Sequence, residues 1–474
     1  MQLVAYGAQD VYLTANPQVT FFKQLYRRHS NFAMESIEQT FNGVGNFGKR
    51  VQSTISRNGD LITRVYVQVT LPAIDPSIVT GSGSFAWVPY LGQFLINNVY
   101  VEIGGQQIDK HYGEWLHIWN ELTLPCGKQL AYLNMVNGYG GALLTPDVSC
   151  TACVTELVAG DAKVLACLNP TLVRNGNDCA LADEVTVLGS DVSGCIPEQT
   201  LYIPLEFWFN RHTGLALPLI ALQYHEVKIN VEFENLQYLC NIVAGDSAAD
   251  SVQRILSNVA NQGLVACSLY VDYIYLDTEE RRRFAQVAHE YLIEQLQFTG
   301  TESVTSTSNK IQLSFNHPCK EIIWVVQNPS YVDCNSQTNA PWRFTDASLG
   351  NPTAVAKIQL NGQDRFTERE GSYFNFVQPY QHHTSTPSTG INVYSFALKP
   401  EDLQPSGSCN FSRIDNAVLN LTLTPATFKT HIINIGNVDE EPDSRQSSAN
   451  VNIYATNYNV LRIMSGMGGL AYSN

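Results

Sequence analysis

The spacing of apolar residues changes once along the chain, from a helical period in the first 30 residues to a period of two afterwards. Asn16-Pro17 combines an N-cap residue with the residue favoured at the first helical position, so it predicts a short helix. This helix would be amphipathic, with apolar and basic faces: Val19, Phe22 and Tyr26 against Lys23 and Arg27. We interpret residues 1–30 as an N-terminal arm. A helix of this kind either packs on its own domain or docks on another body, which is a partner protein or a membrane. Both interpretations stay open.

From Phe41 onward, apolar and polar residues alternate in short runs bounded by Gly, Pro and Asn. The clearest runs are 51–56, 61–71, 98–103, 203–209 and 227–233. Strict alternation over five to ten residues is typical of strands with one buried face. The pattern therefore predicts an all-β protein built of sandwiches.

The strand pattern also repeats. Three pairs of motifs lie 257 residues apart, each at a strand edge or turn: Phe41-Asn42-Gly43 and Phe298-Thr299-Gly300, Leu71-Pro72 and Asn328-Pro329, Gly105-Gln106 and Gly362-Gln363. Between them Val65, Val67 and Val69 match Ile322, Trp324 and Val326. Weaker matches of alternating apolar triplets follow at a spacing of about 191, beginning at Ile203 with Tyr394 and at Val227 with Leu419. A repeat of this size predicts a duplicated domain, with an insertion in the first copy.

These spacings divide the chain into a first sandwich at 31–276, a linker at 277–290 and a second sandwich at 291–474. Asp277-Thr278-Glu279-Glu280 has a capping-box pattern and predicts a linker helix. Three arginines follow it (Arg281, Arg282 and Arg283), which is compatible with a nucleic-acid patch or with an ion-paired, solvated helix. Acidic residues on both sides of the arginines favour the ion-paired, solvated helix: Glu279, Glu280, Glu290 and Glu294.

The insertion, at 125–200, holds six of the eleven cysteines (Cys126, Cys150, Cys153, Cys167, Cys179 and Cys195). Cys150 and Cys153 have the spacing of a zinc-ligand pair, but a second close pair is missing. Free thiols, disulfides and a metal site all stay open as interpretations. Disulfides would require an oxidising environment.

Composition narrows the class of protein. Apolar residues make up 44% of the chain, which excludes a disordered protein, and charged residues only 15%. Low charge with many aromatic residues is typical of surfaces that contact other proteins. The net charge of −15 argues against a protein that coats nucleic acid, although residues 1–64 carry seven basic and four acidic side chains. No apolar run is long enough to span a bilayer, and the first residues do not have the pattern of a signal peptide, so we expect a cytosolic start.

No catalytic constellation is visible. Gly43 to Lys49 matches most of a phosphate-binding loop, but Arg50 stands where Ser or Thr is needed and a strand follows. His382-His383 is an isolated pair that we interpret as a surface loop. Asn410 and Asn420 begin N-glycosylation sequons and are weak candidate sites.

Several long motifs then resemble the major capsid proteins of large eukaryotic DNA viruses, in particular those of chlorella viruses. They are the N-terminal stretch 2–10, followed by 16–23 and 26–28, and then 56–62, 214–220, 289–296, 360–366, 410–416 and 457–470. The resemblance covers nearly the whole chain. The cysteine-rich insertion departs from it.

The resemblance implies two tandem eight-stranded antiparallel jelly rolls with short helices and long loops. It further implies a homotrimer with a pseudo-hexagonal outline that tiles an icosahedral shell around an internal membrane. Such a protein is structural, has no enzymatic activity or cofactor, belongs to the virion and is made and assembled in the host cytoplasm. Some relatives carry glycans on outward loops, including at asparagines outside the sequon. Asn410 and Asn420 are therefore not favoured over other asparagines as glycosylation sites.

We therefore expect the arm, with Lys23, Arg27 and Arg28, on the inner face of a shell, in contact with minor capsid proteins or lipid headgroups. The insertion is expected on the outer face, and neighbouring capsomers at the sides. No sequence-specific binding of nucleic acid is expected. Two alternatives remain: a β-sandwich protein that binds carbohydrate or attaches the virion to its host, and a hydrolase on a jelly roll.

Overall fold

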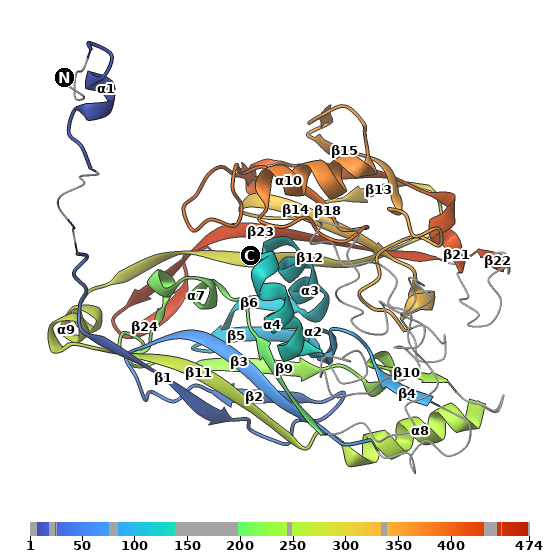
Figure 1. The fold of residues 1–474 in the computed structure, drawn as a ribbon, viewed down its shortest axis with the longest axis horizontal. Helices are drawn as coiled ribbons and strands as arrows, with labels where there is room; N and C mark the ends of the chain where they lie inside the picture. The colour runs from blue at the N-terminus through green and yellow to red at the C-terminus, as the bar shows by residue number, and fades with distance from the viewer. Residues whose placement is uncertain are drawn as a thin grey trace, which may run out of the picture.

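Two antiparallel β sandwiches lie next to each other, and an N-terminal arm extends away from them (Figure 1). This computed structural model describes residues 7–18, 24, 26–74, 84–137, 198–243, 249–332, 339–430, 443–446 and 448–472. We call the two sandwiches roll 1 (β1 to β11) and roll 2 (β12 to β24).

Roll 1 consists of two four-stranded sheets with a common core. One has the order β1 (Phe32–Thr40), β11 (Ala266–Leu276), β3 (Leu61–Leu71), β7 (Gln199–Pro204). The other has the order β2 (Arg50–Thr54), β9 (Val227–Phe233), β5 (Ile96–Ile103), β6 (Gln106–Tyr112). Short additions are β8 (Leu217–Pro218), which pairs with β3, and the pair β4 (Ser84–Trp87) and β10 (Cys240–Val243).

Roll 2 repeats this arrangement. Its first sheet has the order β12 (His289–Val304), β23 (Ala449–Met464), β14 (Pro318–Gln327), β18 (Asn392–Ser395), and its second has β13 (Ser308–Gln312), β20 (Ala417–Leu423), β15 (Thr353–Leu360), β16 (Gln363–Asp364). Shorter strands are β17 (Arg369–Glu370), β19 (Cys409–Asn410), β24 (Met467–Leu470) and the pair β21 (Lys429–Thr430) and β22 (Asp443–Gln446).

The strand order is the same in both rolls. Numbering the eight main strands of each roll along the chain, one sheet has the order 1-8-3-6 and the other 2-7-4-5. This is the jelly-roll arrangement, which limits exposed sheet edges. The prediction of two tandem eight-stranded antiparallel jelly rolls is therefore confirmed.

Two of the three repeat anchors are structurally equivalent. Leu71 and Gln327 end the third strands, and the turns after β5 and β15 both place two residues at positive φ (Gly104 and Gly105; Asn361 and Gly362). The remaining anchor, which matched Phe41-Asn42-Gly43 with Phe298-Thr299-Gly300, is wrong. Gly43 follows β1, whereas Gly300 lies in a bulge within β12.

The two later matches are also wrong, each by two residues. In the ladders Val227 occupies the place of Ala417 and not of Leu419, because Val227 pairs with Ile103 and Ala417 with Leu360. Ile203 likewise occupies the place of Asn392 and not of Tyr394. A shift of two residues along a strand leaves the same side chains on the buried face, so alternation alone could not detect it.

Helices fill the connections. In roll 1 they are α2 (Leu91–Leu95), α3 (Gly113–Thr123), α4 (Cys126–Val136), α7 (Trp208–Arg211) and α8 (Ala249–Gln262), and in roll 2 the π-helical turn η6 (Tyr373–Val377) and α10 (Gln378–His382). The run 203–209 is thus only partly a strand. Pro204 ends β7, and α7 begins at Trp208.

The predicted linker helix is α9 (Thr278–Gln286). The Asp277 carboxylate accepts a hydrogen bond from Thr278 N at 2.7 Å, and Arg281 lies 3.0 Å from the Asp60 carboxylate. This contact fits an ion-paired helix. It also ties the linker to roll 1.

The arm differs from the prediction. In the described part of the arm the helix is α1 (Val11–Thr14), and Asn16 follows it with a φ of 55°, the left-handed conformation and not that of an N-cap residue. Pro17 then cannot continue the helix, and Tyr26 and Arg27 are not helical. Val19, Phe22 and Lys23 lie outside the described residues. Within the described chain, no helix has the length and apolar character needed to cross a bilayer.

Candidate functional site at the seam between the two rolls

The two rolls meet along a buried apolar seam. Helix α3 of roll 1 lies against the outer face of the β12–β23–β14–β18 sheet of roll 2 (Figure 1). Its contributing side chains are Trp115, Ile118, Trp119 and Leu122, and those of roll 2 include Ile323, Val325, Val393 and Tyr454. The ring of Trp115 lies 5.4 Å from that of Tyr454. Burial of this many large apolar side chains fixes the rolls relative to each other.

One half-buried carboxylate lies in this seam. Glu114, in the first turn of α3, accepts hydrogen bonds from Asn452 Nδ2 at 2.9 Å and from the Tyr454 hydroxyl at 3.2 Å. Removal from water raises the pKa of Glu114 to about 7, although both hydrogen bonds favour the charged form. The seam therefore holds an acid that titrates near neutral pH.

A charged cluster lies beside the apolar contacts. Arg211 of α7 is 2.9 Å from the Glu294 carboxylate on β12, and the second oxygen of Glu294 is 2.7 Å from Lys320 Nζ on β14. The Arg211 guanidinium also stacks over the ring of Trp119, at 4.0 Å from its centroid. Lys320 is fully buried and donates to the Pro400 carbonyl at 2.6 Å. The chain Arg211–Glu294–Lys320 thus crosses from roll 1 to roll 2.

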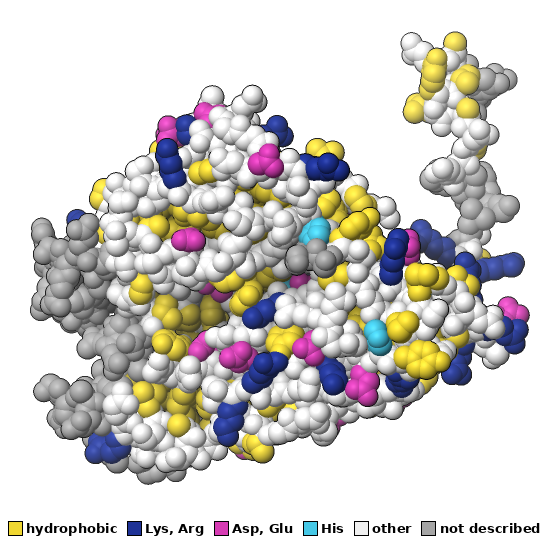
Figure 2. Space-filling view, turned by 180° about the vertical axis from the view of Figure 1, so that it is seen from behind, with side chains coloured by type: hydrophobic (Ala, Val, Ile, Leu, Met, Phe, Trp, Pro, Cys, Tyr) yellow, Lys and Arg dark blue, Asp and Glu magenta, His cyan; other side chains and the backbone are white. Residues whose placement is uncertain are grey.

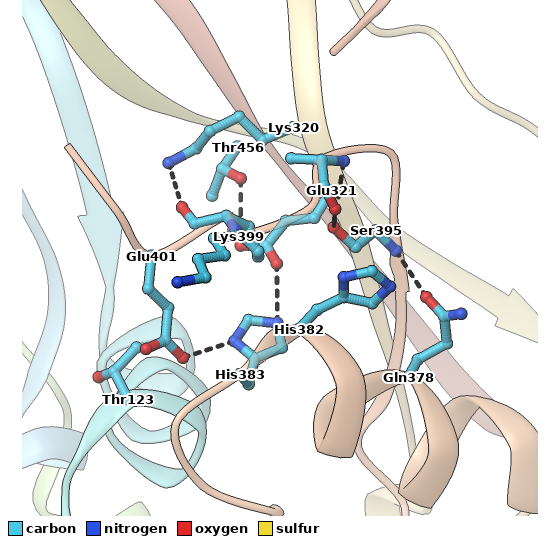
Figure 3. Close-up of polar contacts among 12 residues, drawn as sticks. Thr123, Lys320, Glu321, Gln378, His382, His383, Ser395, Lys399, Glu401 and Thr456 are labelled. Atoms are coloured by element: carbon cyan, nitrogen blue, oxygen red, sulfur yellow. Dashed lines mark hydrogen bonds and ion pairs between the residues drawn. The ribbon is translucent and has the colours of Figure 1, made fainter. Parts of the chain in front are cut away.

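The cluster continues through His383, which lies between two carboxylates (Figure 3). Its Nε2 is 2.9 Å from Glu321 and its Nδ1 is 2.7 Å from Glu401. Burial alone would lower the pKa of His383, but the two carboxylates outweigh it and raise the pKa to about 9. His383 is therefore protonated at neutral pH.

The sequence interpretation of His382-His383 as a surface loop was wrong for His383, whose side chain is fully buried. Its partners Glu321 and Glu401 stand 62 and 18 positions away in the chain, so no local spacing indicated them. The available signal was Lys320-Glu321, two adjacent charges in the otherwise apolar strand β14. Charges in a strand buried on both faces must be paired.

The other candidate residues that the structure describes do not come together. Cys150 and Cys153 lie outside the described residues, while Cys126, at the start of α4, is disulfide-bonded. Asn410 is exposed, but its side chain accepts a hydrogen bond from Ser412 N. Asn420 lies in β20, between β13 and β15, and its Nδ2 is buried. In the described ranges, no three His, Cys, Asp or Glu side chains are grouped to hold a metal ion.

The arm presents unpacked side chains of two kinds. Tyr12 and Leu13 of α1 are 91% and 84% exposed, and Arg27 and Arg28 are exposed where the arm approaches the body. Figure 2 shows apolar side chains at the tip of the arm and basic ones near its base. Exposed apolar side chains on a projecting segment are typical of a docking element.

Two sandwiches of one topology, joined by a helix and packed through a continuous seam, define a double jelly-roll protein. Family models agree with this class. Residues 20–277 match the major capsid protein N-terminus, and residues 280–469 match the large eukaryotic DNA virus major capsid protein. The chain belongs to the family of major capsid proteins of large eukaryotic DNA viruses.

Individual relatives span the whole chain. The major capsid protein of Phaeocystis pouchetii virus is 47% identical over 100% of this chain and 99% of its own length. That of Paramecium bursaria Chlorella virus 1 is 41% identical with the same coverage. The crystal structure of PBCV-1 VP54 superposes with a TM-score of 0.69 at 37% identity, covering 96% of this chain and 100% of VP54. The Faustovirus major capsid protein shares the fold, with a TM-score of 0.67 at 13% identity over 97% and 94% of the two chains.

Proposed function

We propose that this chain is the building block of a virus shell, with three copies forming a trimer whose six jelly rolls give a pseudo-hexagonal outline. The observation that carries this proposal is the identical strand order of two rolls fixed by one seam. Duplication lets three chains present six similar sides, which suits a position with six neighbours. In a trimer the contacts are heterologous and close into a ring. The role is structural, and the trimers tile an icosahedral shell in the virion.

The size of the purified protein tests this proposal. Light scattering on the full chain is expected to give a stable particle of about three times the chain mass of 52.6 kDa. Shell-like particles are expected when trimers are concentrated together with the other virion proteins. A stable monomer or dimer at micromolar concentration would contradict the proposal.

We further propose that the arm lies on the inner face of the shell and contacts minor capsid proteins or the headgroups of an internal membrane. The exposed Tyr12, Leu13, Arg27 and Arg28 support this proposal, because none of them is needed to close either core. Removal of residues 1–25 is then expected to leave the trimer intact and to impair shell assembly. Loss of the trimer itself would contradict this role.

The insertion at 125–200 is proposed to face outward, since long loops between strands supply outer contacts in such a shell. Thiol reagents should then reach its cysteines on intact virions. Labelling only after the virions are opened would place the insertion inside. Assembly in the host cytoplasm completes this proposal, and fractionation of infected cells would test it.

A further inference from the structure

Two free cysteines face each other across adjacent strands of roll 2. Cys319 of β14 is paired directly with Cys409 of β19 in the antiparallel ladder. Residues opposite each other in such a ladder have Cα atoms about 4.5–5.5 Å apart, and a disulfide needs about 4.4–6.8 Å. Their Cβ atoms are about 4.5–5.5 Å apart, against about 3.5–4.5 Å in a disulfide. A small approach of the two strands is therefore enough to join the sulfurs.

Both side chains lie on the same face of the sheet. Successive side chains of a strand alternate between its faces, and directly opposed residues share a face. The contacts agree with this geometry, because Cys319 is part of the roll 2 core and Cys409 packs against that core. Cys319 is fully buried, while Cys409 is partly exposed. The pair thus has one sheltered thiol and one that solvent reaches.

The other two free cysteines of the described chain are opposed by other residue types. Cys240 faces a tryptophan in the β10–β4 ladder, and Cys267 faces Val69 in the β11–β3 ladder. In the part of the chain that the structure describes, no third His, Cys, Asp or Glu is grouped with Cys319 and Cys409 to hold a metal ion. Oxidation to a disulfide is therefore the chemistry that this pair supports.

The pair stands at the neck of a loop. Strand β18 ends at Ser395, which pairs with Glu321, and β19 begins at Cys409, which pairs with Cys319. The loop 396–408 therefore leaves β14 and returns to it within two positions of the same strand. Only two residues of β19 are in the ladder, so few backbone hydrogen bonds close this neck. A bond between the two sulfurs would close it covalently.

The same loop supplies partners to the charged cluster of the seam (Figure 3). The Pro400 carbonyl accepts the hydrogen bond from Lys320 Nζ, and the Glu401 carboxylate is 2.7 Å from His383 Nδ1. Lys320 directly follows Cys319 in the chain. Closing the neck of the loop therefore also restrains one of the two carboxylates between which His383 lies.

We propose that Cys319 and Cys409 form a disulfide when the protein leaves a reducing environment, and that this bond fastens the 396–408 loop to β14. Disulfides form and persist where thiols are not kept reduced. Cys126 is disulfide-bonded, so the chain already contains one oxidised cysteine. The new bond joins residues of one roll in one chain, so it does not depend on the proposed trimer.

The oxidant is a small disulfide such as oxidised glutathione, and the reaction consists of two thiol–disulfide exchanges. In the first, the thiolate of the partly exposed Cys409 attacks one sulfur of glutathione disulfide, which forms a mixed disulfide and releases one glutathione thiolate. In the second, the thiolate of Cys319 attacks the Cys409 sulfur and releases the other glutathione thiolate. The two protons of the cysteines pass through solvent to the two glutathiones. Two thiols are thus oxidised while one disulfide is reduced.

The surroundings of the two thiols make this reaction slow. Burial raises the pKa of Cys319 and of Cys409, and the Arg365 guanidinium opposes the shift at Cys409. Exchange requires the thiolate, which is scarce at neutral pH when the pKa is raised. The pair is therefore expected to stay reduced during folding and to be oxidised later.

Peptide mapping of the wild-type protein tests the bond directly. The full chain is incubated with oxidised and reduced glutathione, free thiols are alkylated in denaturant, and the digest is analysed without reduction. A pair of peptides joined through Cys319 and Cys409 is expected. Alkylation of both cysteines after this incubation, or a bond from either to another cysteine, would overturn the inference. The map uses the wild-type chain, so it stays decisive if a variant fails to fold.

Thermal unfolding measures what the bond contributes. Cys319 and Cys409 stand 90 positions apart, and closing a loop of this length is expected to raise the Tm of the oxidised protein by about 2–4 °C over the reduced protein. Cys409→Ser should remove this rise. Cys267→Ser is the matched control and should keep it, because Cys267 is also a partly buried free thiol on a strand but is opposed by Val69. An equal rise in the wild type and in Cys409→Ser would overturn the proposed role, since other cysteines would then cause it.

Discussion

Replacing Glu114 with glutamine would show how strongly the seam depends on protonation. The carboxyl group has a pKa of about 7 in the folded chain against an ordinary value of 4.5. The folded state therefore binds the proton more tightly than the unfolded state, and the stability of the wild type falls as pH rises from 4.5 through 7. A shift of this size corresponds to about 3 kcal/mol, which is the cost of burying the charge and is fully present above about pH 8.

Glutamine removes this cost and keeps the shape. Its side-chain oxygen can still accept the hydrogen bond that Asn452 Nδ2 donates to the Glu114 carboxylate. We therefore expect Glu114→Gln to match the wild type near pH 5 and to exceed it by about 3 kcal/mol at pH 8.5. The entropy of unfolding of a 474-residue chain is about 1 kcal/mol per degree, so this free-energy difference corresponds to a rise in Tm of about 3 °C.

Thermal unfolding of both proteins between pH 5 and pH 9 measures the effect. Glu302→Gln serves as the control, since Glu302 is exposed and its loss changes the net charge equally. We expect the Tm difference from the wild type to grow between pH 5 and pH 8 for Glu114→Gln only. A difference that is constant across this range, or equal in the control, would refute it.

Two further substitutions test the buried charges and the close approach of Gly371 to the backbone of Thr353. His383→Gln leaves the Glu321 carboxylate without its cation and should lower the free energy of unfolding by about 3–5 kcal/mol at pH 6. Because the pKa of His383 is raised to about 9, its contribution to stability disappears as the pH rises through 9. Urea denaturation should therefore show a smaller loss of unfolding free energy at pH 9.5 than at pH 6. An equal loss at both pH values would contradict this origin. Gly371→Ala should lower Tm, because the added methyl group clashes with the Thr353 carbonyl. Gly127→Ala is the control, since no atom lies near its added methyl group. Equal effects of the two substitutions would show that the close approach at Gly371 is unimportant.

The sequence was sufficient for elements whose pattern is local. Alternation predicted β3, β5 and β9 because each has one face in a core, and the glycine-rich turns marked the repeat because only certain residues adopt positive φ without strain. The N-cap prediction at Asn16 was wrong because Asn is favoured both before a helix and in the left-handed position after one.

The seam was not predictable in the same way. Trp115, Leu116, Ile118 and Trp119 are apolar on both sides of α3, so the sequence shows that the helix is buried but not which roll covers each side. The ion pairs of His383 depend on three segments that only the folded sheet brings together. Periodicity describes one element at a time, whereas these contacts belong to the arrangement of several.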